Sequence, residues 1–382
     1  MQVLHVGSFI GNIGDNANHQ GLRRVIERTL DSGVNYHNWE IRRCYQNYNA
    51  PDQWRFDDEF VRCANEADLV VIGGGNFFEP WIEASATGTT IDLPLEQLTK
   101  ITVPVAFYGV GFDTHKGFSD NTLGRFDRFV HACGGMPNVF LSFRNDGSKD
   151  NYHAAFPNHS VQPHIVPDGA SFFQCEASTW LPDGSIYWAV NIAGDMKPLR
   201  FSGDSNGEWL RFLQNLACVL ESNLGANPQV KIVLIPHIPS DLEAINSLLQ
   251  VMDDFLVRSR VIVAPMWQGW DGCKVTFGLY KQCQLSISMR FHANITPMVM
   301  GVPTIGLASY PKIAALYREM GLKRQPVSAQ ASDFMTKLQC EIDLIKHSPE
   351  QVLTDYTQVL KAARSMVEPF ERFLRQQFSL PQ

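Results

Sequence analysis

Short apolar runs that lead into clusters of glycine constrain the fold of this chain more than any other feature of its sequence. Runs at 2–8, 67–72 and 103–108 are each followed by a glycine-rich turn. Continuous Val, Ile and Leu runs are typical of parallel strands covered on both faces, and ligands gather at the carboxyl ends of such strands. The sequence therefore predicts parallel α/β structure with its polar turns at one edge of the sheet.

A second series of apolar runs begins after a polar, turn-rich stretch at 174–185, which we interpret as a linker. Further strands are expected at 139–143, 164–166, 186–191, 231–236, 260–264, 285–288 and 304–307. Helical spacing of apolar residues predicts helices at 17–30, 209–222, 241–255, 276–281 and 348–378. The expected fold is two doubly wound Rossmann-like α/β domains, at 1–175 and 184–347, that face a cleft. A C-terminal helix at 348–382 is expected to pack back on the first domain.

Charge and composition exclude several classes of protein. The 32 Lys and Arg against 39 Asp and Glu give a net charge of −7, so no general attraction to nucleic acid is expected. No basic leader is visible at the N-terminus, and no apolar run approaches the roughly 18 residues that a transmembrane helix needs. The eight cysteines show no CxxC pair, which favours reduced thiols and predicts no metal site. These features predict a cytoplasmic protein without a transmembrane segment.

The glycine-rich turns of the first domain hold candidate binding residues. Asn12 and Asp15 lie in the turn after the first strand, where backbone amides and a helix N-terminus suit a polar or anionic group. A tight turn with Asp15 as helix cap is an equally good interpretation. Gly74, Gly75 and Asn76 follow the strand at 67–72, where the glycines permit close backbone approach and the amide can both donate and accept.

The most informative stretch follows the expected strand at 285–288. Arg290 and His292 are expected to continue it in extended form, so that both side chains point the same way while Phe291 points into packing. Lys312 follows the strand at 304–307. No acidic residue occurs between Asp271 and Glu319, and this interval therefore predicts a cationic pocket for an anion.

Three further residues follow expected strands. Arg144 is a candidate for a second contact with the same anion, with a salt bridge to Asp146 or Asp150 as the structural alternative. His237 is a candidate site residue or a satisfied structural histidine. Asp168 is a candidate polar contact at the domain boundary or a helix cap.

Several of these motifs together resemble the polysaccharide pyruvyltransferase family. The motifs are Asn12-Ile13-Gly14-Asp15, Gly73-Gly74-Gly75-Asn76, Ser142-Phe143-Arg144, Ser288-Met289-Arg290-Phe291-His292-Ala293, Gly301-Val302-Pro303 and Tyr310-Pro311-Lys312. The resemblance extends from about residue 5 to residue 320, and its most specific part is the Arg-x-His segment with the Gly-x-Pro that follows.

The resemblance implies a glycosyltransferase-B-like fold and the transfer of pyruvate from phosphoenolpyruvate to a sugar as a cyclic ketal. It implies that Arg290 and Arg144 hold the donor's phosphate and carboxylate, and that His292 is the acid/base. The first domain would then hold the acceptor and the second the donor, with no cofactor. The turn at 108–115 departs from the Gly-Gln-Gly-like turn of many relatives, so the acceptor sugar is not defined.

Two other functions stay open at this point. A nucleotide-sugar-dependent glycosyltransferase of the same fold often holds its donor with an acidic residue in the second domain, and the acid-free interval argues against this alternative. A catalytically silent sugar-binding protein is the third possibility, because a fold does not fix a function. The acceptor sugar, the glycan pathway and the oligomeric state are not indicated by the sequence. A lipid-linked acceptor, which would bring the enzyme to the inner membrane, is an open alternative.

Overall fold

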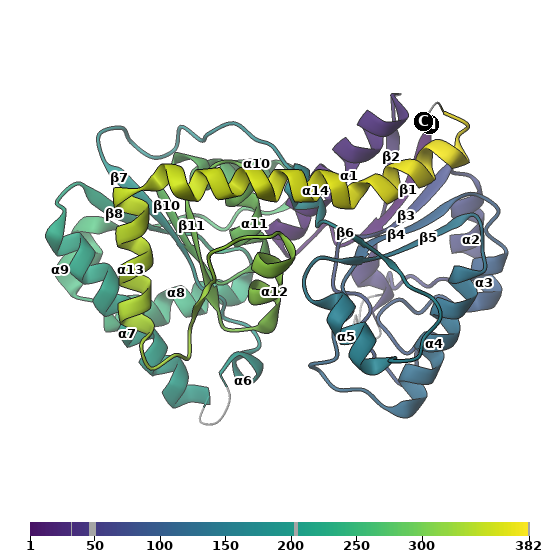
Figure 1. The fold of residues 1–382 in the computed structure, drawn as a ribbon, viewed down its shortest axis with the longest axis horizontal. Coiled ribbons are helices and arrows are strands. Elements are labelled where there is room, and N and C mark those ends of the chain that lie inside the picture. Colours follow the sequence, from purple (N-terminus) through teal and green to yellow (C-terminus); the bar gives the residue numbers. More distant parts are fainter. Residues whose placement is uncertain (32, 46–50, 202–204, 381–382) are drawn as a thin grey trace. The chain divides into compact units, whose positions relative to one another are not determined.

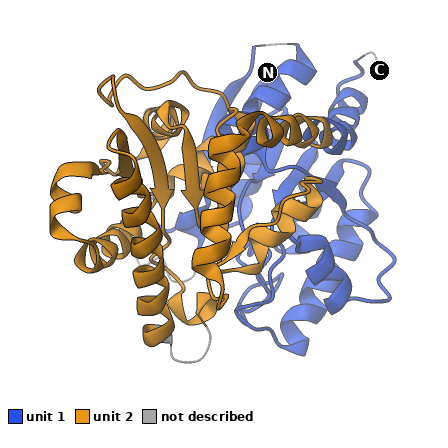
Figure 2. Ribbon diagram, turned by 60° about the vertical axis from the view of Figure 1, so that its left-hand side comes forward, with its two compact units in different colours: residues 1–10, 18–172, 363–382 blue, residues 11–17, 173–362 orange. Residues whose placement is uncertain are grey.

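The computed structural model describes residues 1–31, 33–45, 51–201 and 205–380 and divides into two compact units (Figures 1 and 2). Unit 1 comprises Met1–Ile10, Asn18–Phe172 and Ala363–Gln382, and unit 2 comprises Gly11–Ala17 and Phe173–Ala362. Each unit is built on a parallel sheet with helices, which confirms the expected α/β fold class. Among the described residues no helix is both long and apolar enough to span a bilayer.

Unit 1 has a six-stranded parallel sheet in the order β2-β1-β3-β4-β5-β6. Its strands are β1 (Gln2–Gly7), β2 (Asn35–Glu40), β3 (Leu69–Gly73), β4 (Val105–Val110), β5 (Val139–Arg144) and β6 (His164–Val166). Its helices are α1 (Ile13–Leu30), whose first residues belong to unit 2, η1 (Ile41–Cys44), α2 (Asp58–Asn65), α3 (Leu95–Thr99), α4 (Asp120–Gly134), α5 (Ser148–Ala155) and η2 (Gly169–Phe172). The strand order reverses between β1 and β3.

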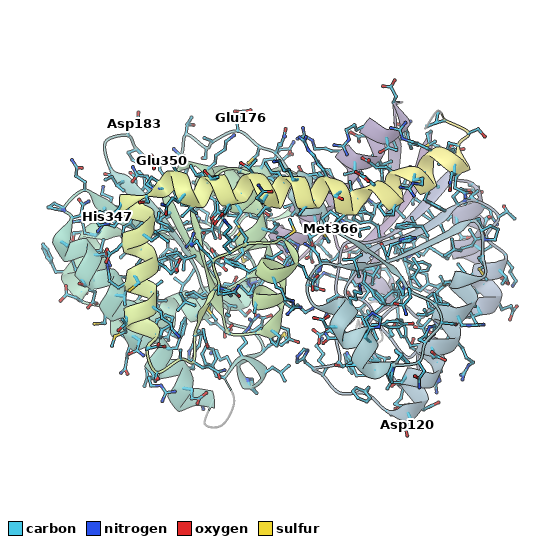
Figure 3. All side chains as sticks on the ribbon, in the orientation of Figure 1. Asp120, Glu176, Asp183, His347, Glu350 and Met366 are labelled. Carbon is cyan, nitrogen blue, oxygen red and sulfur yellow. The ribbon has the colours of Figure 1, made fainter. Side chains whose placement is uncertain are left out.

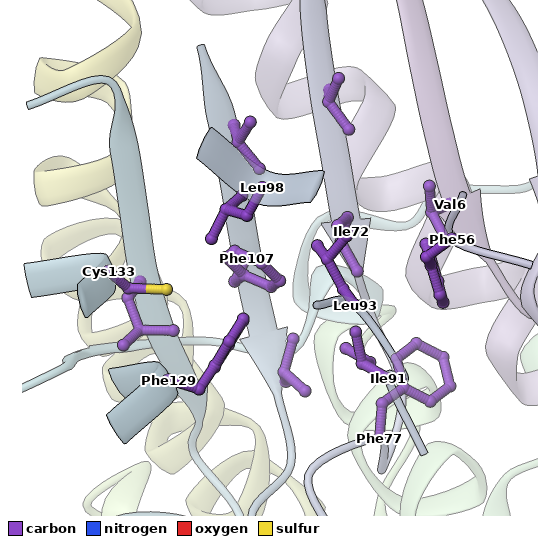
Figure 4. Packing of buried hydrophobic residues seen from close by; sticks show 14 of the residues in the cluster. Val6, Phe56, Ile72, Phe77, Ile91, Leu93, Leu98, Phe107, Phe129 and Cys133 are labelled. Carbon is purple, nitrogen blue, oxygen red and sulfur yellow. The ribbon is translucent and has the colours of Figure 1, made fainter. Parts of the chain in front are cut away.

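Alternate residues of these buried strands supply two hydrophobic clusters on the two faces of the sheet. Ile72 of β3, Phe107 of β4 and Phe129 of α4 belong to one cluster, which Figure 4 shows from close by, and Val70 of β3 is a member of the same cluster. The other apolar residues of β3 join a second cluster with α1 and with the end of the C-terminal helix. Successive side chains of a strand point to opposite faces, so a continuous apolar run is what a sheet covered on both sides requires.

Unit 2 has a second six-stranded parallel sheet, in the order β12-β11-β10-β7-β8-β9. Its strands are β7 (Ile186–Asn191), β8 (Val230–Leu234), β9 (Val261–Val263), β10 (Leu285–Ser288), β11 (Thr304–Ala308) and β12 (Val327–Ser328). Its helices are α6 (Lys197–Arg200), α7 (Ser205–Ala226), α8 (Pro239–Val251), α9 (Asp254–Arg260), α10 (Gly269–Gln282), α11 (Phe291–Val299), α12 (Pro311–Glu319), α13 (Phe334–His347) and α14 (Pro349–Gln377). Here the strand order reverses between β7 and β10, and such a reversal is where doubly wound sheets bind ligands.

The chain passes between the units more often than two consecutive domains would require. The predicted division at 1–175, 184–347 and 348–382 stays a prediction, and the compact units differ from it by placing Gly11–Ala17 in unit 2. Helix α14 changes unit between residues 362 and 363, so that Glu350 lies in its unit 2 part and Met366 in its unit 1 part (Figure 3).

Candidate functional site

The residues after β10 do not continue the strand, and this corrects the extended geometry expected for Arg290 and His292. β10 ends at Ser288, Arg290 is the N-cap of α11, and His292 lies in the first turn of that helix. The backbone N–H of Arg290 donates to Oδ1 of Asn191, the last residue of β7, at 3.1 Å. Arg290 is therefore positioned at the reversal of the strand order, by the neighbouring strand.

Two carboxylates hold the Arg290 guanidinium, which is nearly buried. Its Nε donates to Oδ2 of Asp241 at 2.7 Å, and its Nη2 donates to Oδ1 of Asp195 at 2.9 Å and to Oδ1 of Asp241 at 2.5 Å. Burial alone would lower the pKa of Arg290, but these two carboxylates raise it above its usual value. The guanidinium is thus fixed in place and carries its full charge.

The acid-free interval in the sequence therefore does not give a site without carboxylates, and the cationic pocket for an anion stays a prediction. Asp195 follows β7 and Asp241 lies in the first turn of α8, so both reach Arg290 from outside the interval. Parallel strands far apart in the sequence end at one edge of the sheet, and charges counted along the chain miss such neighbours. The argument that this interval made against a nucleotide-sugar enzyme therefore fails.

A second arginine, Arg200, belongs to the same group and was missed in the sequence analysis. Its Nη2 donates to Oδ1 of Asp195 at 3.3 Å, and its Nη1 donates to the Ser309 hydroxyl at 3.2 Å. The guanidinium lies 5.8 Å from the centre of the Tyr310 ring, and the Lys312 ammonium lies 6.0 Å from the same centre. The predicted Lys312 thus joins the group by way of Tyr310. Asking which charged residues follow each predicted strand would have found Asp195, although Arg200 has no such signal.

His292 packs against the glycine-rich turn at 11–17, which unit 2 contains. A Cβ on Gly14 would lie 2.5 Å from Nδ1 of His292, so only glycine permits this approach. The Asp15 carboxylate lies 3.9 Å from the same nitrogen and accepts a hydrogen bond from Nδ2 of Asn12 at 3.1 Å. The structure therefore brings the predicted residues Asn12, Asp15 and His292 together.

His237 lies in the same unit but is fully buried. Its Nε2 lies 3.0 Å from the Tyr280 hydroxyl, and its backbone carbonyl accepts from the N–H of Ile13 at 3.3 Å. Burial, and then the charges of Arg290 and His292, lower the pKa of His237 well below 6.5. The buried imidazole of His237 is therefore neutral, which fits a structural role close to Arg290 and His292.

The burial of His237 and of His5 predicts that the protein loses stability in mild acid. Burial also lowers the pKa of His5 well below 6.5. Below about pH 6.5 the unfolded chain therefore binds more protons than the folded chain, and the free energy of unfolding falls by up to about 1.4 kcal/mol per pH unit for each histidine. Denaturant unfolding between pH 5 and pH 7 measures this slope.

His237→Asn should make the slope shallower by about one proton, because the imidazole that it removes gains a proton only on unfolding. An unchanged slope in His237→Asn would contradict the assignment.

In unit 1, three predicted residues meet around Asn18, which the sequence analysis missed. Nδ2 of Asn18 donates to Oδ2 of Asp168 at 2.8 Å and to the carbonyl of Gly74 at 3.0 Å. Arg144 donates to Asp146 at 2.7 Å and to Asp168 at 3.3 Å. The salt bridge considered as the structural alternative for Arg144 is therefore present, and its guanidinium lies in a buried network.

Asn76 and Gly75 lie at the end of β3 in a different setting. Nδ2 of Asn76 donates to Oε1 of Glu79 at 2.5 Å and lies 3.4 Å from Oδ2 of Asp113. The carbonyl of Gly75 accepts from the N–H of Gly111 at 2.9 Å. Within the described parts of the chain, no group of three His, Cys, Asp or Glu side chains is arranged to hold a metal ion.

The chain was compared with models of protein families and with curated proteins. A family model described as polysaccharide pyruvyl transferase matches residues 12–310. No curated protein matches the chain at a significant level.

Solved structures of low sequence identity share the fold over nearly the whole chain. A putative UDP-N-acetylglucosamine 2-epimerase from Listeria monocytogenes has a TM-score of 0.57 at 11% identity and covers 99% of this chain and 96% of its own. A trehalose 6-phosphate synthase from Burkholderia multivorans has a TM-score of 0.54 at 10% identity and covers 99% of both chains. These similarities show a glycosyltransferase-B-like fold.

Proposed function

Because this chain belongs to the polysaccharide pyruvyl transferase family, and is therefore a transferase, we propose that it transfers pyruvate from phosphoenolpyruvate to a sugar of a polysaccharide or its precursor. The observation that supports this proposal most directly is the placement of Arg290 and His292 on one strand-to-helix junction. The junction lies where the strand order of unit 2 reverses. A fixed guanidinium suits the anionic donor, and an imidazole beside it suits proton transfer.

The proposed reaction begins with protonation of the donor's methylene carbon by His292. That carbon becomes a methyl group, and the neighbouring carbon becomes a carbocation to which one sugar hydroxyl adds. Phosphate then leaves with cleavage of the carbon–oxygen bond, and a second hydroxyl closes the ketal. One hydroxyl proton replaces the proton that His292 supplied, and the other leaves with the phosphate. The donor is already activated, so the scheme needs no cofactor.

In this scheme Arg290 binds the phosphate of the donor, and His292 supplies the proton. Charged donors fixed where negative charge develops stabilise a transition state, and Arg290 meets this requirement for the departing phosphate. His292, on the same strand-to-helix junction, is then the group that transfers the proton.

The class of the acceptor and the cellular compartment of the reaction are part of the proposal. Family membership implies a sugar or glycan acceptor. We expect the reaction in the cytoplasm, where phosphoenolpyruvate is available, and at the inner membrane if the acceptor is lipid-linked.

Nucleotide-sugar transfer is a second candidate, favoured by the carboxylates Asp195 and Asp241 beside Arg290. Both carboxylates are engaged by guanidinium groups, and this pairing makes them less suited to hold sugar hydroxyls. We therefore prefer the first candidate.

Thermal unfolding with different ligands tests the choice. A ligand at 100 times its dissociation constant stabilises the folded protein by about 2.7 kcal/mol. Phosphoenolpyruvate should raise the unfolding temperature, whereas UDP-N-acetylglucosamine and UDP-glucose should not. Stabilisation by the nucleotide sugars alone would favour the second candidate, and stabilisation by none of them would contradict both.

A further inference from the structure

Asp195 bridges Arg290 and Arg200, the two arginines of the site in unit 2. Its Oδ1 accepts from Nη2 of Arg290 at 2.9 Å and from Nη2 of Arg200 at 3.3 Å. The Asp195 side chain is 31% exposed, whereas the two arginine side chains are 11% and 9% exposed. Of these three groups, the Asp195 carboxylate is therefore the most exposed to solvent.

Asp241, the other carboxylate that binds Arg290, is buried and is held by backbone hydrogen bonds. Its side chain is fully buried and accepts hydrogen bonds from the backbone N–H groups of His237 at 2.9 Å, Ile238 at 3.3 Å and Gly194 at 3.2 Å. Displacing Asp241 would leave these buried donors unsatisfied, at a cost of about 1–3 kcal/mol each. Asp195 accepts side-chain hydrogen bonds from the guanidinium groups of Arg290 and Arg200, so its carboxylate is the one that an anion can replace.

The loop that carries Asp195 has a constrained backbone on either side of this residue. Gly194 approaches the carbonyl of Ser240 so closely that an added Cβ would lie 1.8 Å from that oxygen. Met196 has a φ of 56°, in the left-handed region that side chains other than glycine rarely adopt. Such strain is typical of segments that function rather than of simple connections.

We propose that Asp195 occupies the position of the donor's phosphate in the free protein, and that Arg200 is the second arginine that binds this phosphate. Arg290 and Arg200 carry two positive charges, and Asp195 and Asp241 balance them. A phosphate that displaces Asp195 keeps the same two guanidinium groups satisfied and adds further acceptor oxygens. Arg200 also keeps its hydrogen bonds to the Asp195 carbonyl, at 2.9 Å, and to the Ser309 hydroxyl throughout the exchange.

This exchange has a consequence for turnover. Asp195 competes with the bound anion, so it weakens binding of the donor, and by returning to the arginines it speeds the departure of phosphate. The inference rests on the proposed function only for the identity of the anion as phosphoenolpyruvate.

Binding of inorganic phosphate and of phosphoenolpyruvate to Asp195→Asn, measured by calorimetry, tests the inference. Removing the competing charge should tighten binding of both anions by about tenfold, which corresponds to about 1.4 kcal/mol. The KM for the donor should fall, while kcat stays the same or decreases as phosphate release slows. Arg200→Lys should weaken binding of both anions at least severalfold, because lysine lacks the planar fork.

Asp271→Asn is the matched control, since it removes the same charge from a fully exposed side chain of unit 2 and should change neither affinity. Unchanged or weaker phosphate binding in Asp195→Asn, and likewise in Asp195→Ser, would overturn the inference. Tighter phosphate binding in these variants without binding of phosphoenolpyruvate by any form would support the exchange and contradict the proposed function instead.

Discussion

Replacing His292 with Gln should lower turnover at saturating phosphoenolpyruvate by about 100-fold or more, the usual effect of losing a general acid. Binding of the donor should change little, because Arg290 and Arg200 carry that task. Steady-state release of phosphate gives kcat, and calorimetry gives the dissociation constant of the donor. His153→Gln, a replacement of the same kind in α5 of unit 1, should leave both quantities unchanged.

A different result would assign His292 another role. If the variant binds the donor much more weakly and keeps its kcat, His292 contacts the phosphate and does not supply the proton. Near wild-type turnover in His292→Gln with saturating donor would remove it from the mechanism.

Replacing Arg290 with Ala should lower the free energy of unfolding of unit 2 strongly. The change leaves Asp241 buried without its cation, and breaking a buried ion pair from one side costs about 3–5 kcal/mol. Binding of phosphoenolpyruvate should be lost as well, because a fixed cation of the site disappears. Denaturant unfolding and calorimetry measure the two effects separately.

The two effects of Arg290 can be separated by a second change. Arg290→Met combined with Asp241→Asn removes the stranded charge, so this double variant should recover part of the stability but none of the donor binding. Recovery of both would show that Arg290 acts only as a structural residue. Wild-type stability in Arg290→Ala would show that the buried pair contributes little.

The strands that were predicted correctly are those in which buried apolar residues dominate. β7 and β10 have the predicted bounds: β7 is an almost continuous apolar run, and β10 alternates apolar residues with serine. β2 was missed because Asn35–Glu40 is polar and largely exposed, as an edge strand is. β12 has only two residues and gives no pattern that can be read.

Helix α11 was missed for a different reason. It contains Pro297, a residue that normally interrupts a helix, and nearly all of its side chains are buried, so it lacks the polar face that marks a surface helix. Arg290 and His292 were therefore placed in an extended segment. That both side chains reach one ligand stays a prediction, and the extended geometry on which it rested was wrong.

The site was predictable where one segment supplies it and unpredictable where several do. The Arg290 and His292 segment was identified from its own residues. Its partners Asp195, Asp241 and Arg200 come from the connections after β7 and β8, and only the strand order brings them to Arg290. The order of the strands in the sheet of unit 2 cannot be read from a single sequence.

The return of α14 to unit 1 also bears on how this protein is made. Val367, Phe370, Phe373 and Leu374 complete the hydrophobic cluster that covers Leu69 and Val71 on one face of the first sheet. These residues are synthesised after those of unit 2, so part of that face stays uncovered while unit 2 is made, even though its strands are made early. Unit 1 is therefore completed only after unit 2 has been synthesised, and its exposed apolar sheet needs protection from aggregation until then.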